Sequence, residues 1–184
     1  MKAVIDTSSL ISFVRYYIPF DEGNRLMDFL ENQILEKNIV VLDKVAKECS
    51  YLRNGQVIKT LPFINDKKYK TSTGSLIAPQ RFHNLVDHNF INGTEKNQLS
   101  EAEYQIKRTD YINSADCTMI LYAFTNKDTV IVTEESGYNN DGKAFKKIPE
   151  NCKSIGITTM TLPDFLKQNG ISLSIEVAAA TLFE

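Results

Sequence analysis

The sequence predicts an α/β protein organised around a parallel β-sheet. Short apolar runs at residues 3–5, 39–42 and 129–133 are typical of buried strands. Helical segments separate them, and a strand–helix–strand–helix order favours parallel strands joined by right-handed crossovers. A further strand over residues 155–160 brings the expected sheet to four or five strands flanked by helices.

The first part of the chain alternates regularly between strand and helix. The first strand ends at Asp6, and the hydroxyl side chains of residues 7–9 are suited to cap a short helix. Apolar residues at helical spacing predict an amphipathic helix over residues 24–37. Asp43 follows the second strand and is the expected N-cap of a helix from residue 44 to about residue 52.

The middle of the chain, residues 53–98, has a weaker pattern. Asn54-Gly55 and Asn92-Gly93 indicate turns, and residues 82–90 suggest a short helix. Because long irregular segments are uncommon inside a domain, we expect helices here with one mobile loop near Thr71.

Regular structure is predicted again from Ser100 onwards. Ser100 and Glu103 form a capping box for a helix through about residue 108, and Ser114 is placed to cap the next helix. Thr161, followed by a proline and an acid, predicts the start of a last helix. The expected organisation is one domain over residues 1–170 and a tail, residues 171–184, of unassigned structure.

Composition narrows the class of protein. The 184 residues suit one domain, and a net charge of −2 gives no basic field that would announce a nucleic-acid partner. Three cysteines without C-x-x-C spacing and two histidines argue against a disulfide framework or a zinc site. Asp6 interrupts the first apolar run, so no signal peptide is expected, and no segment has the length of a membrane span. We expect a cytoplasmic protein without a membrane partner.

Acidic residues follow the predicted strands. Asp6, Asp43 and the pair Glu134-Glu135 stand at or just after strand ends, where open α/β sheets place ligands. Glu48 and Asp116 lie among apolar or small residues in predicted helices. A buried carboxylate costs several kcal/mol unless it is paired or bound to a metal. Without accompanying histidines, an oxygen-only site favours Mg²⁺ or Mn²⁺ over zinc.

Each acid also has a purely structural interpretation. Asp6 and Asp43 could cap the helices that follow them, and Asp116 could stabilise a helix N-terminus. Glu48 could be a solvated helix residue, and the Glu134-Glu135 pair could be loop charge. These alternatives stay open for each residue alone, whereas the order of the acids along the chain favours a shared site.

The same segments resemble those of a known family. V-I-D-T-S-S-L-I at Val4–Ile11 resembles the opening motif of PIN-domain nucleases, and V-I-V-T-E-E at Val130–Glu135 resembles their closing motif. Glu48, in the helix after the second strand, and A-D-C-T-M-I-L-Y-A at Ala115–Ala123 are also similar to the family. Residues 147–166 resemble the end of a bacterial branch close to the VapC-like toxins.

The resemblance implies a PIN-like three-layer sandwich with a cleft at the carboxyl ends of the strands. It implies a Mg²⁺- or Mn²⁺-dependent endoribonuclease acting on single-stranded or structured RNA, commonly a toxin held by a protein antitoxin, with a possible homodimer. The implied metal ligands and catalytic acids are Asp6, Glu48, Asp116 and Glu135, with Glu134 as a register alternative. Ser8 and Thr133 match hydroxyl positions that orient the carboxylates.

Basic residues offer contacts to an RNA backbone, although a solvated surface is the simpler interpretation of each. The candidates are Lys67, Lys68, Lys70 and Arg81, or Lys143, Lys146 and Lys147. Bases could stack on Tyr69 or Tyr138.

Two other functions stay open. One is a non-catalytic PIN-like module that binds RNA or protein. The other is a phosphatase or receiver-like protein that uses Asp6 as a nucleophile. The sequence around Asp6 lacks the D-x-D pattern expected of such a phosphatase.

Overall fold

A five-stranded parallel sheet lies at the centre of the computed structural model, which describes residues 2–137 and 142–172. The strands are β1 (Lys2–Ile5), β2 (Ile39–Leu42), β3 (Lys70–Thr71), β4 (Thr129–Val132) and β5 (Thr159–Met160), in the spatial order β3-β2-β1-β4-β5. The predicted fold class, an α/β sandwich of the PIN-like three-layer type, is confirmed.

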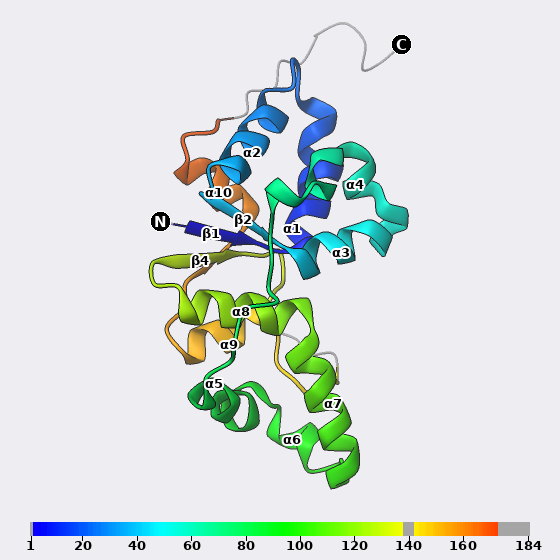
Figure 1. Cartoon of the computed structure of the whole chain (residues 1–184), viewed down its shortest axis with the longest axis vertical. Coiled ribbons are helices and arrows are strands. Elements are labelled where there is room, and N and C mark those ends of the chain that lie inside the picture. Colours follow the sequence, from blue (N-terminus) through cyan, green and yellow to red (C-terminus); the bar gives the residue numbers. More distant parts are fainter. Residues whose placement is uncertain (1, 138–141, 173–184) are drawn as a thin grey trace, which may run out of the picture.

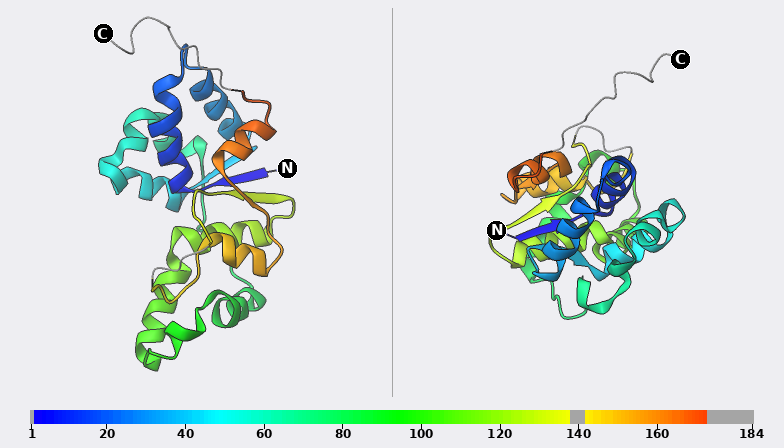
Figure 2. Two further views of the ribbon diagram at one scale, coloured as in Figure 1. Left: turned by 180° about the vertical axis from the view of Figure 1, so that it is seen from behind. Right: turned by 90° about the horizontal axis from the view of Figure 1, so that it is seen from above.

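Helices cover both faces of the sheet, as Figures 1 and 2 show. The α-helices are α1 (Thr7–Ser12), α2 (Arg25–Leu35), α3 (Asp43–Tyr51), α4 (Gln56–Thr60), α5 (Gln80–Leu85), α6 (Gly93–Lys96), α7 (Glu101–Asn113), α8 (Ala115–Thr125), α9 (Ile148–Ser154) and α10 (Leu162–Gln168). In Figure 1, α1, α2 and α10 lie above the sheet, and α8 and α9 lie below it. Helices α5–α7 extend the lower side further, and we call them the lower lobe.

The three central strands are buried on both faces, which explains why they are continuous apolar runs rather than alternating ones. Residues 3–5, 39–42 and 130–132 are each at most 6% exposed. Ala3 of β1 pairs with Ile39 of β2 on one side and with Val130 of β4 on the other. This register brings the carboxyl ends of β1 and β4 side by side, where the site acids follow.

Several predicted helix signals are confirmed. Ser100 and Glu103 form the capping box of α7, and Thr161 accepts a hydrogen bond from the backbone N–H of Asp164 at the start of α10. Ser114 ends α7 and also caps α8, because its hydroxyl accepts from the Cys117 N–H at 3.1 Å. Helix α7 continues to Asn113, five residues beyond the predicted end, and therefore meets α8 directly at this shared cap.

Some predictions for strands and loops are wrong. The region near Thr71 is the edge strand β3, which pairs with Leu42, instead of a loop. Asp43 is the first residue of α3 rather than its N-cap, and its carboxylate accepts from the Thr73 N–H at 3.0 Å and hydroxyl at 2.6 Å. Asp43 thus anchors the chain that leaves β3 and takes no part in an acidic cluster.

The last predicted strand is shorter than expected. Only Thr159 and Met160 of the predicted segment 155–160 pair with β4. The preceding residues close α9: Gly156 has a φ of 74°, and the Ile157 N–H returns to the Cys152 carbonyl at 3.0 Å. The strand that the sequence did not predict is β3, which comes from the middle of the chain. Residues 173–184 of the unassigned tail lie outside the described residues.

The lower lobe is connected to the loop before α9. Ile91 and Phe145 form an antiparallel bridge, with hydrogen bonds of 2.8 Å from the Asn92 N–H to the Ala144 carbonyl and from the Lys146 N–H to the Phe90 carbonyl. This bridge holds residues 144–146 near the carboxyl edge of the sheet. Across the described part of the chain, no helix combines the length and apolar character needed to span a membrane.

Candidate functional site

Asp6 lies at the carboxyl end of β1 and is 5% exposed. Its carboxylate caps α1 by accepting the Thr7 N–H at 2.7 Å. It also accepts the hydroxyl of Ser8 at 2.5 Å and the hydroxyl of Thr133 at 3.0 Å. The capping role and a place in the acidic site are therefore compatible, because one carboxylate serves both.

The two hydroxyls are themselves held by the chain after β4. The Glu134 N–H donates to Ser8 Oγ at 3.1 Å, and the Glu135 N–H donates to Thr133 Oγ1 at 3.2 Å. Because each hydroxyl oxygen accepts a backbone N–H, its own proton is available to Asp6. Ser8 and Thr133 thus make the contacts that a carboxylate-orienting role requires.

Glu48 reaches the same place from α3. Its Oε2 accepts the Thr7 hydroxyl at 2.8 Å, so the first turn of α1 connects Asp6 and Glu48. Burial raises the pKa of the Glu48 carboxyl, and the negative charge of Asp6 acts in the same direction, while the Thr7 hydrogen bond opposes them. The Glu48 side chain is only partly buried and faces the other acids instead of the open solvent.

Asp116 stands in the first turn of α8 and is the most perturbed acid of the site. Burial, followed by the charges of Asp6, Glu135 and Glu48, raises its pKa to about 7, against a partial compensation by Lys143. Three carboxylates from three other elements therefore act on Asp116. The four predicted acids converge at the carboxyl edge of the sheet.

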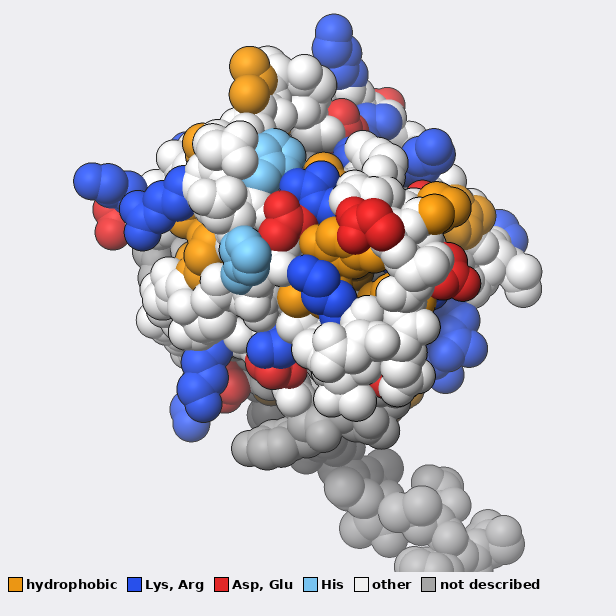
Figure 3. Space-filling view, turned by 90° about the horizontal axis from the view of Figure 1, so that it is seen from below, with side chains coloured by type: hydrophobic (Ala, Val, Ile, Leu, Met, Phe, Trp, Pro, Cys, Tyr) orange, Lys and Arg blue, Asp and Glu red, His pale blue; other side chains and the backbone are white. Residues whose placement is uncertain are grey.

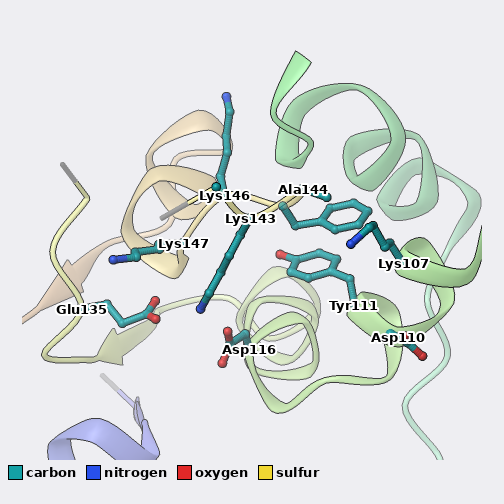
Figure 4. A pocket seen from close by; sticks show the side chains of 11 residues that line it. Lys107, Asp110, Tyr111, Asp116, Glu135, Lys143, Ala144, Lys146 and Lys147 are labelled. Carbon is teal, nitrogen blue, oxygen red and sulfur yellow. The ribbon is translucent and has the colours of Figure 1, made fainter. Parts of the chain in front are cut away.

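Glu134 and Glu135 point to different helices. The Glu134 carboxylate accepts the Leu162 N–H at 2.7 Å at the start of α10, and its side chain is exposed. Glu135 accepts the Ile148 N–H at 3.0 Å at the start of α9 and, unlike Glu134, faces Asp116 across a shared cavity (Figure 4). Of the two registers, Glu135 is the one that faces Asp116.

The donor set suits a hard cation, because carboxylate and hydroxyl oxygens surround the point where the acids converge. The ion pairs between described side chains are Arg108–Asp87 and Lys146–Glu150, so neither neutralises a site acid. As the side chains stand, no three acidic, histidine or cysteine groups of the described residues lie close enough to hold a metal ion. Binding would therefore require the carboxylates to move together, and the long side chains of Glu48 and Glu135 have the rotamer freedom to do so.

A cavity of about 330 Å³, which we call the recess, adjoins the acids between α7, α8 and the loop before α9. Asp116 and Glu135 form one end of it, and Lys143 extends from the loop toward both acids (Figure 4). The remaining lining residues are Lys107, Asp110, Tyr111, Gly142, Ala144, Phe145, Lys146 and Lys147. Sequence reasoning missed Lys107, Tyr111 and Phe145, because nothing in the sequence relates residues 107–111 to residue 145.

The other predicted basic residues lie elsewhere. Lys67, Lys68 and Lys70 are in or next to the edge strand β3, two strands away from β1. Arg81 lies over the Phe124 ring at 5.9 Å. Figure 3, seen from the end of the lower lobe, shows positive and negative side chains interspersed rather than a basic track. Of the predicted basic residues, Lys143 extends toward Asp116 and Glu135.

The predicted stacking residues do not serve that purpose in the described structure. Tyr69 is 4% exposed, and its hydroxyl donates to Glu31, so it has no free ring face for a base. Its assignment as a stacking residue is wrong. Tyr138 lies outside the described residues.

Fold and site together define an α/β protein of the PIN-like three-layer type with four carboxylates at the carboxyl edge of its parallel sheet. The model of one protein family, "Domain of unknown function (DUF4411)", matches residues 4–173, and the chain belongs to this family. The match includes all four acids. No protein of curated function matches the chain.

Proposed function

We propose that the protein is a Mg²⁺- or Mn²⁺-dependent endoribonuclease that hydrolyses phosphodiester bonds of RNA. The observation that carries the proposal is the convergence of four carboxylates from four elements. Burial, together with the charges of Asp6, Glu135 and Glu48, raises the pKa of Asp116 to about 7. None of these acids has an ion pair with a described basic side chain that would balance the charge. A divalent cation is the partner that such a group of oxygens lacks.

In this proposal Asp6, Glu48, Asp116 and Glu135 hold the cation. A divalent ion there would lower the pKa of an attacking water and neutralise charge on the phosphate. Ser8 and Thr133 donate hydrogen bonds to Asp6 and so hold that carboxylate in a fixed orientation. Glu134 caps α10 and is placed outside the ligand set.

The test is RNA cleavage by the Asp116→Asn variant in the presence of Mg²⁺ or Mn²⁺. We expect activity to fall by about 100-fold or more, because a ligand carboxylate is lost while the shape is kept. Asp128→Asn is the matched control, since Asp128 is exposed in the turn before β4, at the opposite edge of the sheet. Undiminished cleavage by a folded Asp116→Asn variant would rule out the assigned role.

The two glutamates give a second comparison. Glu135→Gln should reduce cleavage strongly, whereas Glu134→Gln should leave most of it, because only Glu135 shares the recess with Asp116. The reverse ranking would assign the fourth ligand position to Glu134.

The alternative function is a PIN-like module that binds RNA or protein without cutting. It is favoured by the finding that no three described acids lie within ligand distance of one point. Calorimetric titration with Mn²⁺ separates the two, since the nuclease must bind the ion and the module need not. A role as the toxin of a toxin–antitoxin pair, a protein antitoxin, a homodimer and a cytoplasmic location rest on the resemblance and the sequence, and they stay predictions.

A further inference from the structure

We infer that the recess holds one nucleotide next to the cleaved bond, with Lys143 and Lys107 contacting its phosphates and the Tyr111–Phe145 pair forming its wall. The inference rests on the proposed function, because it assigns a place on the substrate relative to the acids. It names two residues that the function itself does not require, Lys107 and Tyr111.

The position of the recess supports this assignment. It begins at Asp116 and Glu135 and continues to Lys107 on α7, so a chain that reaches the acids passes directly into it. In Figure 4, the Lys143 ammonium lies at the acidic end and the Lys107 ammonium at the end with the aromatic side chains. A volume of about 330 Å³ is at the lower end of the range of small-ligand sites and leaves no room for a base-paired segment.

The charge of the lining side chains favours an anion in the recess once a divalent ion is bound to the acids. The lining contains four lysines and three acids. In Figure 4, Lys146 and Asp110 point away from the cavity, and Lys146 pairs with Glu150 at 3.2 Å. With a divalent ion on the acids, the remaining lining charge is positive, which suits a phosphate group.

The wall of the recess is rigid before any ligand binds. The rings of Tyr111 and Phe145 are stacked 4.2 Å apart and are nearly parallel, with an interplanar angle of 3°. The fully buried Asn151 amide donates to the Tyr111 hydroxyl at 2.8 Å and to the Lys146 carbonyl at 2.7 Å. The antiparallel bridge between Ile91 and Phe145 holds the same loop from the side of the lower lobe. Phe145 is only 7% exposed and lies against Tyr111, so the aromatic surface open to the recess belongs to the partly exposed Tyr111. An aromatic side chain held between two cations suits one nucleotide of a single strand.

Binding is best measured with proteins that retain Asp116, because the positive charge of the recess depends on a divalent ion held by the acids, and with an oligonucleotide whose linkages resist cleavage. A fluorescent single-stranded oligoribonucleotide of about six nucleotides is titrated in Mg²⁺ and followed by anisotropy over a range of salt concentrations. We expect Lys107→Ala and Lys143→Ala each to weaken binding about five- to tenfold and to reduce the salt slope by about 0.7, the value for one phosphate contact on a single strand.

Lys127→Ala is the charge-matched control. Lys127 is exposed in the turn between α8 and β4, at the amino edge of the sheet and away from the recess. Equal affinity and equal salt slope for Lys107→Ala, Lys143→Ala and Lys127→Ala would overturn the inference. Binding of a duplex of the same length with the same dependence on Lys107 would also overturn it, because the recess accommodates a single unpaired nucleotide.

Steady-state cleavage by proteins that retain Asp116 gives an independent readout. Lys107 contacts the flanking nucleotide and none of the reacting atoms, so Lys107→Ala should raise KM several-fold with kcat nearly unchanged. A loss of kcat with unchanged KM would contradict the assignment. If the wild type bound the oligonucleotide through Lys107 and Lys143 but cut no RNA in Mg²⁺ or Mn²⁺, the proposed nuclease would be rejected and the nucleotide site retained.

Discussion

Replacing Asp116 by asparagine should stabilise the metal-free protein at neutral and alkaline pH. Most substitutions at partly buried positions destabilise a protein, so the sign of this effect is diagnostic. The Asp116 carboxyl has a pKa of about 7 in the folded protein, against an ordinary value of 3.8. The folded state therefore binds this proton more tightly than the unfolded state, and its stability falls as pH rises from about 4 to about 7.

The magnitude follows from the two pKa values. Over the full interval the loss for this one group approaches about 4 kcal/mol, and between pH 5 and pH 8 it is about 2 to 3 kcal/mol. Asparagine keeps the shape of the side chain but cannot ionise. The free energy of unfolding of Asp116→Asn minus that of the wild type should therefore be about 2 to 3 kcal/mol larger at pH 8 than at pH 5.

The assay is urea unfolding of both proteins in EDTA at pH 5 and pH 8. For a chain of this size a change of 1 kcal/mol corresponds to about 2 to 4 °C in Tm, so thermal scans can confirm the result. All other titratable groups are common to both proteins, so the difference between the two proteins reports on Asp116. A pH-independent difference, or a variant less stable than the wild type at pH 8, would refute the claim that burial and the charges of Asp6, Glu135 and Glu48 raise the pKa of this carboxyl.

Two further predictions concern metal binding and the hydroxyls. Mn²⁺ should raise the Tm of the wild type but not of Asp116→Asn. Binding near pH 7 should also release protons, because the Asp116 carboxyl has a raised pKa and must lose its proton to bind the ion; in calorimetry this is seen as heats that vary with the buffer. Heats independent of the buffer would contradict this coupling. Thr133→Val removes a donor to the buried Asp6 carboxylate and should cost about 1 to 3 kcal/mol of stability at pH 7, whereas Thr133→Ser should restore most of it; equal losses in both variants would assign the effect to packing rather than to the hydrogen bond.

The sequence predicts the central part of the fold well, because that part depends on local patterns. The runs at 39–42 and 129–132 are buried on both faces, so they are apolar without interruption. Caps such as Ser114 and Thr161 act within three residues of themselves and are visible in the sequence for that reason.

Elements that depend on distant partners could not be predicted. Strand β3 has two residues, and it is a strand only because Val41 and Leu42 pair with it. The turn at Gly156, which follows α9, shortens the predicted strand. A glycine with positive φ can close a helix or interrupt a strand, and the sequence alone does not decide which.

The acids of the site could be predicted and the basic side of the recess could not. Asp6 immediately follows β1 and Glu135 lies three residues after the end of β4, and the topology of a parallel sheet brings such positions to one edge. Lys107 and Tyr111 lie about one helix turn apart on α7. Phe145, which stacks on Tyr111, is 34 residues further along the chain than Tyr111. Only the packing of α7 against α8 and the bridge to Ile91 bring these residues together.

The lower lobe therefore has a function that its sequence does not indicate. The Phe90 carbonyl and the Asn92 N–H hold residues 144–146 in place, and these residues directly follow Lys143. Without that bridge the loop before α9 would be anchored at its α9 end by Asn151, and the Lys143 end would lack a fixed position against the acids. Residues 90–92 line no part of the recess but support the loop that does, so differences there should alter which RNA is bound without altering the carboxylates that act on it.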